Sequence, residues 1–127
     1  MRKQQMMCVD DQIGIRMLMG EIFKDDYEVI SASSGKEAVD IAKKVKVDIA
    51  ILDMNLNDIK GTEVLRQLRN INQNIIGVII TGYRDTEHMK EIRKTNPELI
   101  IHKPFDIHKF KRKVKKLMKK SLESKAV

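Results

Sequence analysis

The sequence predicts an α/β fold in which a parallel sheet is covered by helices on both faces. Apolar runs typical of buried strands alternate along the chain with segments of helical periodicity. The runs at 49–52 and 75–80 are continuous rather than alternating in polarity, as expected for strands that are buried on both faces. Alternation of this kind is typical of a doubly wound sheet, here with five strands and five helices.

The first half of the chain contains three expected strands, at 5–9, 27–30 and 49–53. Between the first two, a helix is expected over 13–23, because its apolar residues recur at helical spacing. A second helix should begin after Ser34, which forms a capping box with Glu37, and should continue to about Val45.

The second half continues the alternation. After a loop that ends at Gly61, a short helix is expected over 62–70, followed by strands at 75–80 and 99–101. Between those strands Asp85 can cap a helix over 86–95, which Pro97 ends. Asp106 should cap a terminal helix over about 106–121, and residues 122–127 are expected to be disordered.

The length of the chain indicates one domain spanning residues 1–127, because 127 residues suit a single hydrophobic core. The net charge of +7 is concentrated at the end of the chain: His108 to Val127 carry nine Lys/Arg and one acid, and the other 107 residues carry 16 basic and 17 acidic side chains. We interpret the basic face of the terminal helix as solvated. The sequence lacks a signal peptide core and an apolar stretch long enough for a membrane span, so we expect a cytoplasmic protein.

Polar residues terminate four of the five expected strands. They are Asp10, Asp11, Asp53, Thr81 and Lys103. Because the carboxyl ends of parallel strands lie at one edge of the sheet, these side chains should converge there. Crowded carboxylates repel one another unless a cation intervenes, and Mg²⁺ prefers oxygen ligands of this kind. The lysine and the threonine hydroxyl suit the oxygens of a phosphoryl group.

This set of residues favours transfer of a phosphoryl group onto a carboxylate, since the sequence offers no convincing general base. Asp53 is the best candidate acceptor, because it ends the central strand while the Asp10-Asp11 pair suits a metal. Taken singly, a strand-end aspartate is more often a turn residue or a helix cap, Thr81 could belong to a turn, and Lys103 could be a solvated surface residue. The prediction therefore rests on their joint pattern.

Four motifs resemble the receiver domain of bacterial two-component response regulators. They are Val9-Asp10-Asp11, Leu52-Asp53-Met54, Thr81-Gly82-Tyr83 and Lys103-Pro104-Phe105-Asp106. Within that family, the chain looks most like the single-domain regulators of the sporulation phosphorelay. The resemblance covers essentially the whole chain and implies a flavodoxin-like sheet of strand order 2-1-3-4-5.

The resemblance also implies the roles of the site residues. Asp53 would be phosphorylated by a sensor histidine kinase, and Thr81 and Lys103 would contact the phosphoryl oxygens. Mg²⁺ would be held by Asp10, Asp11, Asp53 and the backbone carbonyl of Asn55. The Lys103–Pro104 peptide bond would be cis. We expect a phosphotransfer intermediate that catalyses its own phosphorylation, rather than a turnover enzyme.

A regulator of this group would act by docking a kinase or a histidine phosphotransfer protein. The matching surface would comprise Gln12, Gly14, Ile15, Leu18, Tyr83, Arg84, Pro104 and Phe105. Our hypothesis is that Ile15 and Phe105 anchor the partner. The periodicity leaves open whether Ile15 and Leu18 belong instead to the core. We expect no nucleic acid partner, and a monomer or a weak dimer.

Three positions depart from the family pattern. Ile100 stands where an aromatic residue or histidine is usual, so the familiar threonine–aromatic switch cannot work in its usual form. Asn57 replaces a common proline, which predicts a looser loop after the acceptor. Gly82 follows Thr81 in place of the usual alanine, which adds backbone freedom.

Two other classes of function would also use features of this sequence. A haloacid-dehalogenase-like phosphatase also uses a strand-end aspartate, but it needs a second carboxylate two residues later, where this chain has Asn55. Nucleic-acid or membrane binding through the basic terminal helix is the other alternative. No helix-turn-helix motif or aromatic platform accompanies that helix.

Overall fold

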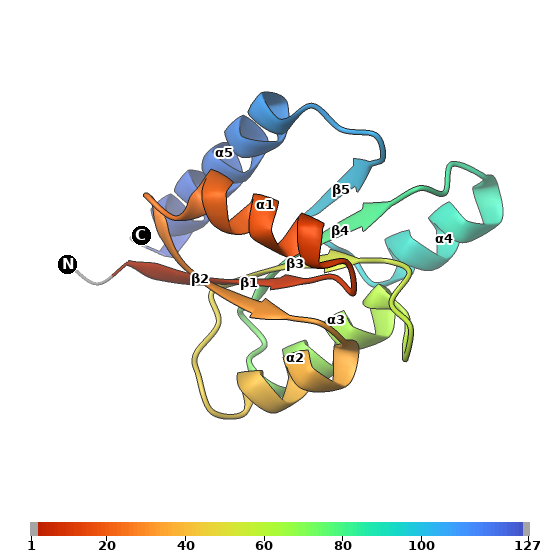
Figure 1. The fold of residues 1–127 in the computed structure, drawn as a ribbon, viewed down its shortest axis with the longest axis horizontal. Coiled ribbons are helices and arrows are strands. Elements are labelled where there is room, and N and C mark those ends of the chain that lie inside the picture. The colour runs from red at the N-terminus through yellow and green to blue at the C-terminus, as the bar shows by residue number, and fades with distance from the viewer. Residues whose placement is uncertain (1–2, 126–127) are drawn as a thin grey trace.

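Five parallel strands form the central sheet in a computed structural model that describes residues 3–125. The strands are β1 (Gln4–Val9), β2 (Tyr27–Ala32), β3 (Ile49–Asp53), β4 (Ile76–Thr81) and β5 (Leu99–His102). Their order in the sheet is β2-β1-β3-β4-β5, and every neighbouring pair is parallel (Figure 1). The predicted fold class and strand order are therefore confirmed.

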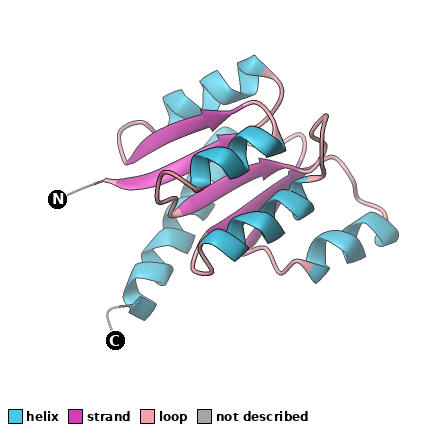
Figure 2. Cartoon of the chain, turned by 90° about the horizontal axis from the view of Figure 1, so that it is seen from below, coloured by secondary structure: helices cyan, strands magenta, loops and turns pink. Residues whose placement is uncertain are grey.

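Helices cover both faces of this sheet (Figure 2). They are α1 (Ile13–Phe23), α2 (Gly35–Ala42), α3 (Gly61–Ile71), α4 (Thr86–Lys94) and α5 (Ile107–Lys125). The α1 and α5 helices share one apolar cluster with the sheet, and α2, α3 and α4 share the other. Among the described residues, no helix is long and apolar enough to cross a membrane.

The core is continuous through the sheet because alternate residues of each strand face opposite helical layers. In β1, Met6 and Cys8 pack towards α1 and α5, whereas Met7 and Val9 pack towards α2 and α3. The Cys8 side chain is buried, and burial raises the pKa of its thiol to about 12. The thiol therefore stays protonated and contributes as a small apolar group.

The three helix caps predicted from the sequence are present in the structure. The Ser34 hydroxyl accepts a hydrogen bond from the Glu37 amide at 3.1 Å, and the Asp85 carboxylate accepts one from the His88 amide at 3.1 Å. The Asp106 carboxylate accepts a hydrogen bond from the Lys109 amide at 2.9 Å. The Lys103–Pro104 peptide bond is cis, as the family resemblance implied.

Helix ends were predicted less well. The α2 helix ends at Ala42, three residues before the predicted end, with a tight turn in which the Lys44 amide donates to the Ile41 carbonyl at 2.9 Å. This turn brings Val47, which is 2% exposed, into the core just before β3. At the other end of the chain, α5 continues to Lys125, beyond the predicted end near residue 121, because no Gly or Pro stops the helix. Residues 126–127 lie outside the described part of the chain.

Candidate functional site

Two neighbouring strands bring three carboxylates together at the carboxyl edge of the sheet. Asp10 directly follows β1, and Asp53 is the last residue of β3, whose Leu52 pairs with Val9. One oxygen from each of Asp10, Asp11 and Asp53 lies within 4.8 Å of the others. Asp10 and Asp53 are only 4% and 5% exposed, so two of these three acids are buried.

The backbone around these acids fixes their orientation. The Asp10 carboxylate accepts a hydrogen bond from the Gln12 amide at 2.9 Å, and the Asp10 carbonyl accepts one from the Arg16 guanidinium at 2.7 Å. The Asp53 carboxylate accepts a hydrogen bond from the Asn55 amide at 3.3 Å. Both carboxylates are therefore held by the loops that follow their strands.

Burial raises the pKa of Asp10, and the neighbouring charges of Asp53 and Asp11 raise it further. The Gln12 amide and the Lys103 ammonium act in the opposite direction, but the net shift is upward. An ionised Asp10 is therefore costly here unless a cation offsets the crowded negative charge. Three converging carboxylates suit a hard divalent cation such as Mg²⁺, so the donor set fits the cofactor that the sequence predicts.

Lys103 supplies a positive charge beside Asp53. Its ammonium donates to an Asp53 carboxylate oxygen at 3.3 Å, and it comes from the loop directly after β5. The Lys103 amide donates to the Thr81 carbonyl at 2.8 Å, which ties this loop to the end of β4. The Lys103 ammonium is thereby held beside the end of β3.

Thr81 is buried at the end of β4, next to β3 in the sheet. Its hydroxyl oxygen accepts a hydrogen bond from the Tyr83 amide at 2.9 Å. The hydroxyl proton can still be donated, because a hydroxyl group is both a donor and an acceptor. The placement of Thr81 thus agrees with the predicted convergence of strand ends.

Tyr83 lies across the edge of the site in a way that sequence reasoning did not foresee. Its hydroxyl donates to the Asn55 side-chain oxygen at 3.2 Å, and its ring stacks on His88 with centroids 3.7 Å apart. The His88 ring in turn contacts the Asp85 carboxylate at 2.8 Å. No local pattern signals these contacts, because Asn55 and Tyr83 belong to loops after different strands.

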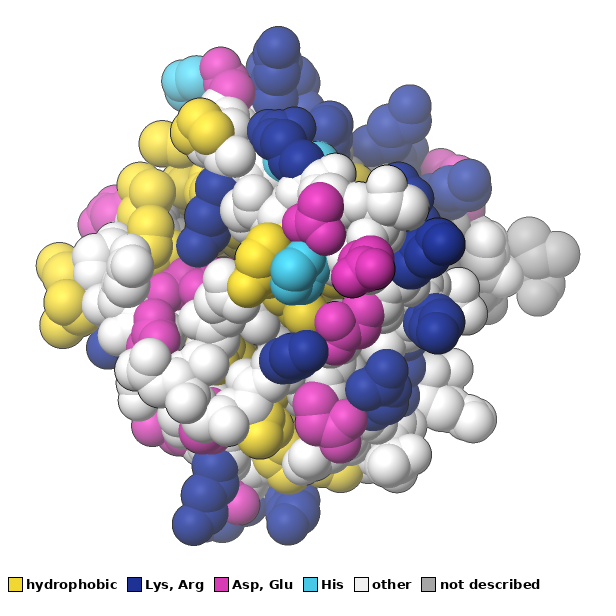
Figure 3. All heavy atoms as spheres, turned by 90° about the vertical axis from the view of Figure 1, so that its right-hand side faces the viewer, with side chains coloured by type: hydrophobic (Ala, Val, Ile, Leu, Met, Phe, Trp, Pro, Cys, Tyr) yellow, Lys and Arg dark blue, Asp and Glu magenta, His cyan; other side chains and the backbone are white. Residues whose placement is uncertain are grey.

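The predicted partner surface lies only partly within one groove. Five of its eight residues line a surface groove of about 540 Å³ between α1 and the loop before α5. They are Gln12, Ile15, Leu18, Pro104 and Phe105, and Lys103 and Ile107 complete the lining. Gly14, Tyr83 and Arg84 do not line it. In Figure 3, which faces this edge of the molecule, hydrophobic side chains gather beside acidic ones.

The loop after Asp53, which the sequence predicts to be looser because of Asn57, is anchored by side chains. The two carboxylate oxygens of Asp58 accept hydrogen bonds from the amides of Gly35 and Lys36, at 3.0 and 2.8 Å. Lys60 forms an ion pair with Glu91 of α4 at 2.9 Å. The side chains of Asp58 and Lys60 therefore restrain this loop, as a proline at position 57 would. A second departure, Ile100, is half-buried and packs against the core on the α2–α3 face.

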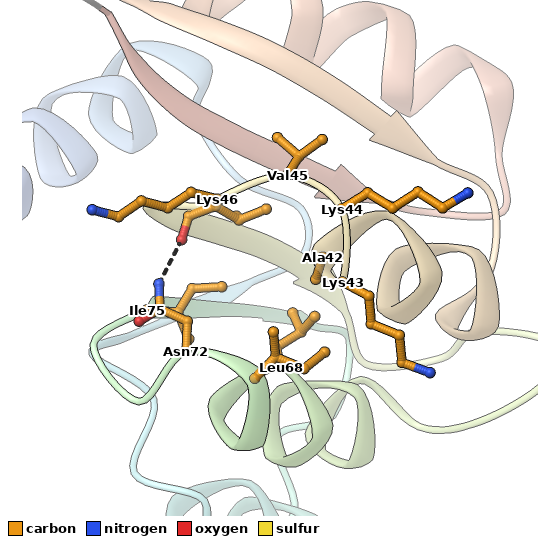
Figure 4. Close-up of a pocket in the computed structure, with 10 residues that line it drawn as sticks. Ala42, Lys43, Lys44, Val45, Lys46, Leu68, Asn72 and Ile75 are labelled. Atoms are coloured by element: carbon orange, nitrogen blue, oxygen red, sulfur yellow. Dashed lines mark hydrogen bonds between the residues drawn. The ribbon is translucent and has the colours of Figure 1, made fainter.

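A second hollow, of about 340 Å³, lies at the opposite edge of the sheet, between the α2–β3 connection and the end of α3. Figure 4 shows that the side chains of Lys43, Lys44 and Lys46 at its rim point away from one another. The Asn72 side-chain amide donates to the Val47 carbonyl at 3.2 Å across it. This hollow brings no acidic residues together, so the strand-end cluster remains the candidate site.

Comparison with known proteins agrees with this geometry. Residues 6–115 match the family model for the response regulator receiver domain. The chain is 34% identical over 119 residues to sporulation initiation phosphotransferase F of Bacillus subtilis, covering 93% of this chain and 96% of that protein. It is 27% identical over 112 residues to the polar-differentiation response regulator DivK of Brucella ovis, covering 87% of this chain and 91% of that protein.

Solved structures show the same fold. A CheY-like receiver domain protein from Methanospirillum hungatei superimposes with a TM-score of 0.89 at 22% identity, over 96% of this chain and 98% of the other. The family model, the relatives and the shared fold all indicate a receiver domain. The acids Asp10, Asp11 and Asp53 lie together at the edge of the sheet that the sequence motifs predict. The chain belongs to the response regulator receiver domain family.

Proposed function

We propose that Asp53 accepts a phosphoryl group from a phosphohistidine of a sensor histidine kinase and passes it to a histidine of a partner phosphotransfer protein. The observation that carries the proposal is the position of Asp53, whose carboxylate lies among two other acids and 3.3 Å from the Lys103 ammonium. An Asp53 oxygen would attack phosphorus, forming a P–O bond as the P–N bond breaks. The bonding electrons would return to the histidine nitrogen of the kinase.

Neighbouring residues would stabilise the charge that builds up on the phosphoryl oxygens. The Lys103 ammonium would bind one oxygen, and the Thr81 hydroxyl would donate a hydrogen bond to another. The carboxylates of Asp10, Asp11 and Asp53 and the carbonyl of Asn55 would hold Mg²⁺. The bound ion would neutralise negative charge between the acceptor and the incoming group.

Asn55 favours phosphotransfer over catalytic hydrolysis. A strand-end phosphatase would need a carboxylate at this position to activate water, and the Asn55 amide has no such acid–base function. Its side-chain oxygen instead accepts the hydrogen bond from Tyr83. The phosphorylated aspartate should therefore persist long enough to meet a partner.

The test is incubation of the protein with Mg²⁺ and acetyl phosphate, followed by mass spectrometry of the intact chain. We expect a mass increase of one phosphoryl group, which is absent without Mg²⁺ and in Asp53→Asn. The matched control is Asp26→Asn, an exposed aspartate in the turn just before β2 that should leave the adduct unchanged. Continuous phosphate release without an adduct would instead identify a phosphatase.

We further propose that the partner docks in the groove between α1 and the loop before α5. The groove borders Lys103, so a helix seated there could present its histidine to Asp53. Ile15 and Phe105 are half-buried, which leaves part of each side chain available as an apolar anchor. Gly14, Tyr83 and Arg84 would contact the partner from outside the groove.

Ile15→Ala is expected to slow phosphoryl transfer from the cognate histidine kinase about tenfold, as loss of an interface anchor typically does. Phosphorylation by acetyl phosphate should be unchanged, because that small donor does not use the groove. Ile71→Ala is the control, since Ile71 is 40% exposed at the end of α3, beside the hollow at the opposite edge. Wild-type transfer rates in Ile15→Ala would rule out docking through this groove.

A further inference from the structure

The N-terminus of α2 is completed by a residue from the loop that follows the acceptor. The first four amides of a helix have no partner within the helix. In α2, the amides of Glu37 and Ala38 donate to the Ser34 hydroxyl and carbonyl, both at 3.1 Å. The remaining two, from Gly35 and Lys36, donate to the two carboxylate oxygens of Asp58, at 3.0 and 2.8 Å. Asp58 is therefore a cap supplied from 22 residues away in the sequence.

Close packing accompanies these hydrogen bonds. A Cβ atom added to Gly35 would come within 2.5 Å of Ile59 and 2.7 Å of Val64. Ile59, the neighbour of Asp58, also packs against the core on the α2–α3 face. The loop residues 58 and 59 thus rest directly on the first residue of α2.

The same loop returns to the acceptor strand. The Gly61 amide donates to the Met54 carbonyl at 2.9 Å, and Asn55 and Lys60 form an antiparallel bridge. Asp58 lies at the far turn of this narrow loop, and Asn55 lies at its near end, two residues after Asp53. A restraint at the turn therefore limits how far the Asn55 carbonyl can move.

The second side-chain anchor of the loop is weaker. Lys60 and Glu91 form an ion pair at 2.9 Å, but their side chains are 61% and 35% exposed, so water screens the attraction. Asp58 is exposed as well, but its carboxylate makes two charge-assisted hydrogen bonds, to the amides of Gly35 and Lys36 at the positive end of a helix dipole. Asp58 is therefore the principal polar anchor of the loop.

We propose that Asp58 is a positioning residue, which fixes the loop on α2 and thereby holds the Asn55 carbonyl ready for the divalent cation. The inference rests on the proposed Mg²⁺ site. It assigns to Asp58 the restraint that a proline at position 57 would otherwise provide. Ordering the loop before the ion arrives lowers the entropic cost of binding.

The test compares Asp58→Ala with Ser34→Ala, which removes the other side-chain cap of the same helix without touching the loop. Mg²⁺ affinity is measured by isothermal titration calorimetry without a phosphodonor, and thermal unfolding is measured in the absence of Mg²⁺. Both variants should lower the melting temperature. Only Asp58→Ala should weaken Mg²⁺ binding, by about fivefold, a size typical of the coupling between two sites. Asp58→Asn should retain part of the affinity, since its amide oxygen can still accept one hydrogen bond.

Amide hydrogen exchange gives a second measurement that does not depend on the metal. Exchange at Gly61 should be faster in Asp58→Ala and unchanged in Ser34→Ala. Unchanged Mg²⁺ affinity in Asp58→Ala, or an equal loss of Mg²⁺ affinity in Ser34→Ala, would overturn the positioning role of Asp58. Neither result would contradict the proposed metal site. Wild-type protein that binds no Mg²⁺ would overturn both the proposed metal site and this inference.

Discussion

Replacing Gly61 with alanine is expected to lower the free energy of unfolding by about 1–3 kcal/mol, the usual cost of forcing an extra carbon into a packed site. It should also abolish phosphorylation of Asp53. A Cβ atom at position 61 would lie 2.4 Å from the Asp53 carbonyl oxygen and 3.0 Å from the Met54 Cα. Backbone atoms cannot rotate away as a side chain can, so the end of β3 would have to move.

The effect can be measured by urea unfolding together with intact-mass analysis after treatment with acetyl phosphate. Gly20→Ala is the matched control, because no atom lies within 4 Å of its added Cβ and Gly20 is inside α1. That variant should be more stable than the wild type by roughly 0.5–1 kcal/mol, since alanine favours helix over glycine. Wild-type stability and normal adduct formation in Gly61→Ala would show that neither folding nor phosphorylation needs the close approach of Gly61 to the backbone of Asp53 and Met54.

Phe110→Ala is expected to cost about 3–5 kcal/mol, the range found when a buried phenylalanine is truncated. Phe110 is 1% exposed and joins three elements of the fold. Its ring meets Phe23 of α1 edge to face at 5.7 Å, and it meets Phe105 at 5.2 Å. The substitution would leave a cavity between α1, α5 and the loop that carries Lys103.

Because small domains are stable by only about 5–15 kcal/mol, this loss should be plain in a urea titration. Leu122→Ala on the same helix is the control, since Leu122 is 49% exposed and should change stability by less than about 0.5 kcal/mol. A loss below about 1 kcal/mol in Phe110→Ala would mean that neighbouring side chains refill the site.

The sequence by itself determined the fold class and which polar residues lie at the carboxyl edge of the sheet, because both follow from local patterns. The apolar run 49–52 is typical of a strand covered on both faces, and the chain turns polar at Asp53. Once the sheet was taken to be parallel, Asp10, Thr81 and Lys103 had to share an edge with that aspartate. Helix caps such as Ser34 were also predictable, because the cap and the amide that it binds are three residues apart.

Only the tertiary structure decided how the loop after Asp53 is held. The sequence suggested a looser loop at Asn57, yet Asp58 binds the amides of α2, and Gly61 packs against the backbone of Asp53. The groove beside Lys103 likewise joins α1 to a loop more than 80 residues away. Such contacts depend on how distant segments approach after the sheet has assembled. Periodicity and capping signals report the conformation of neighbouring residues, so they carry no information about these approaches.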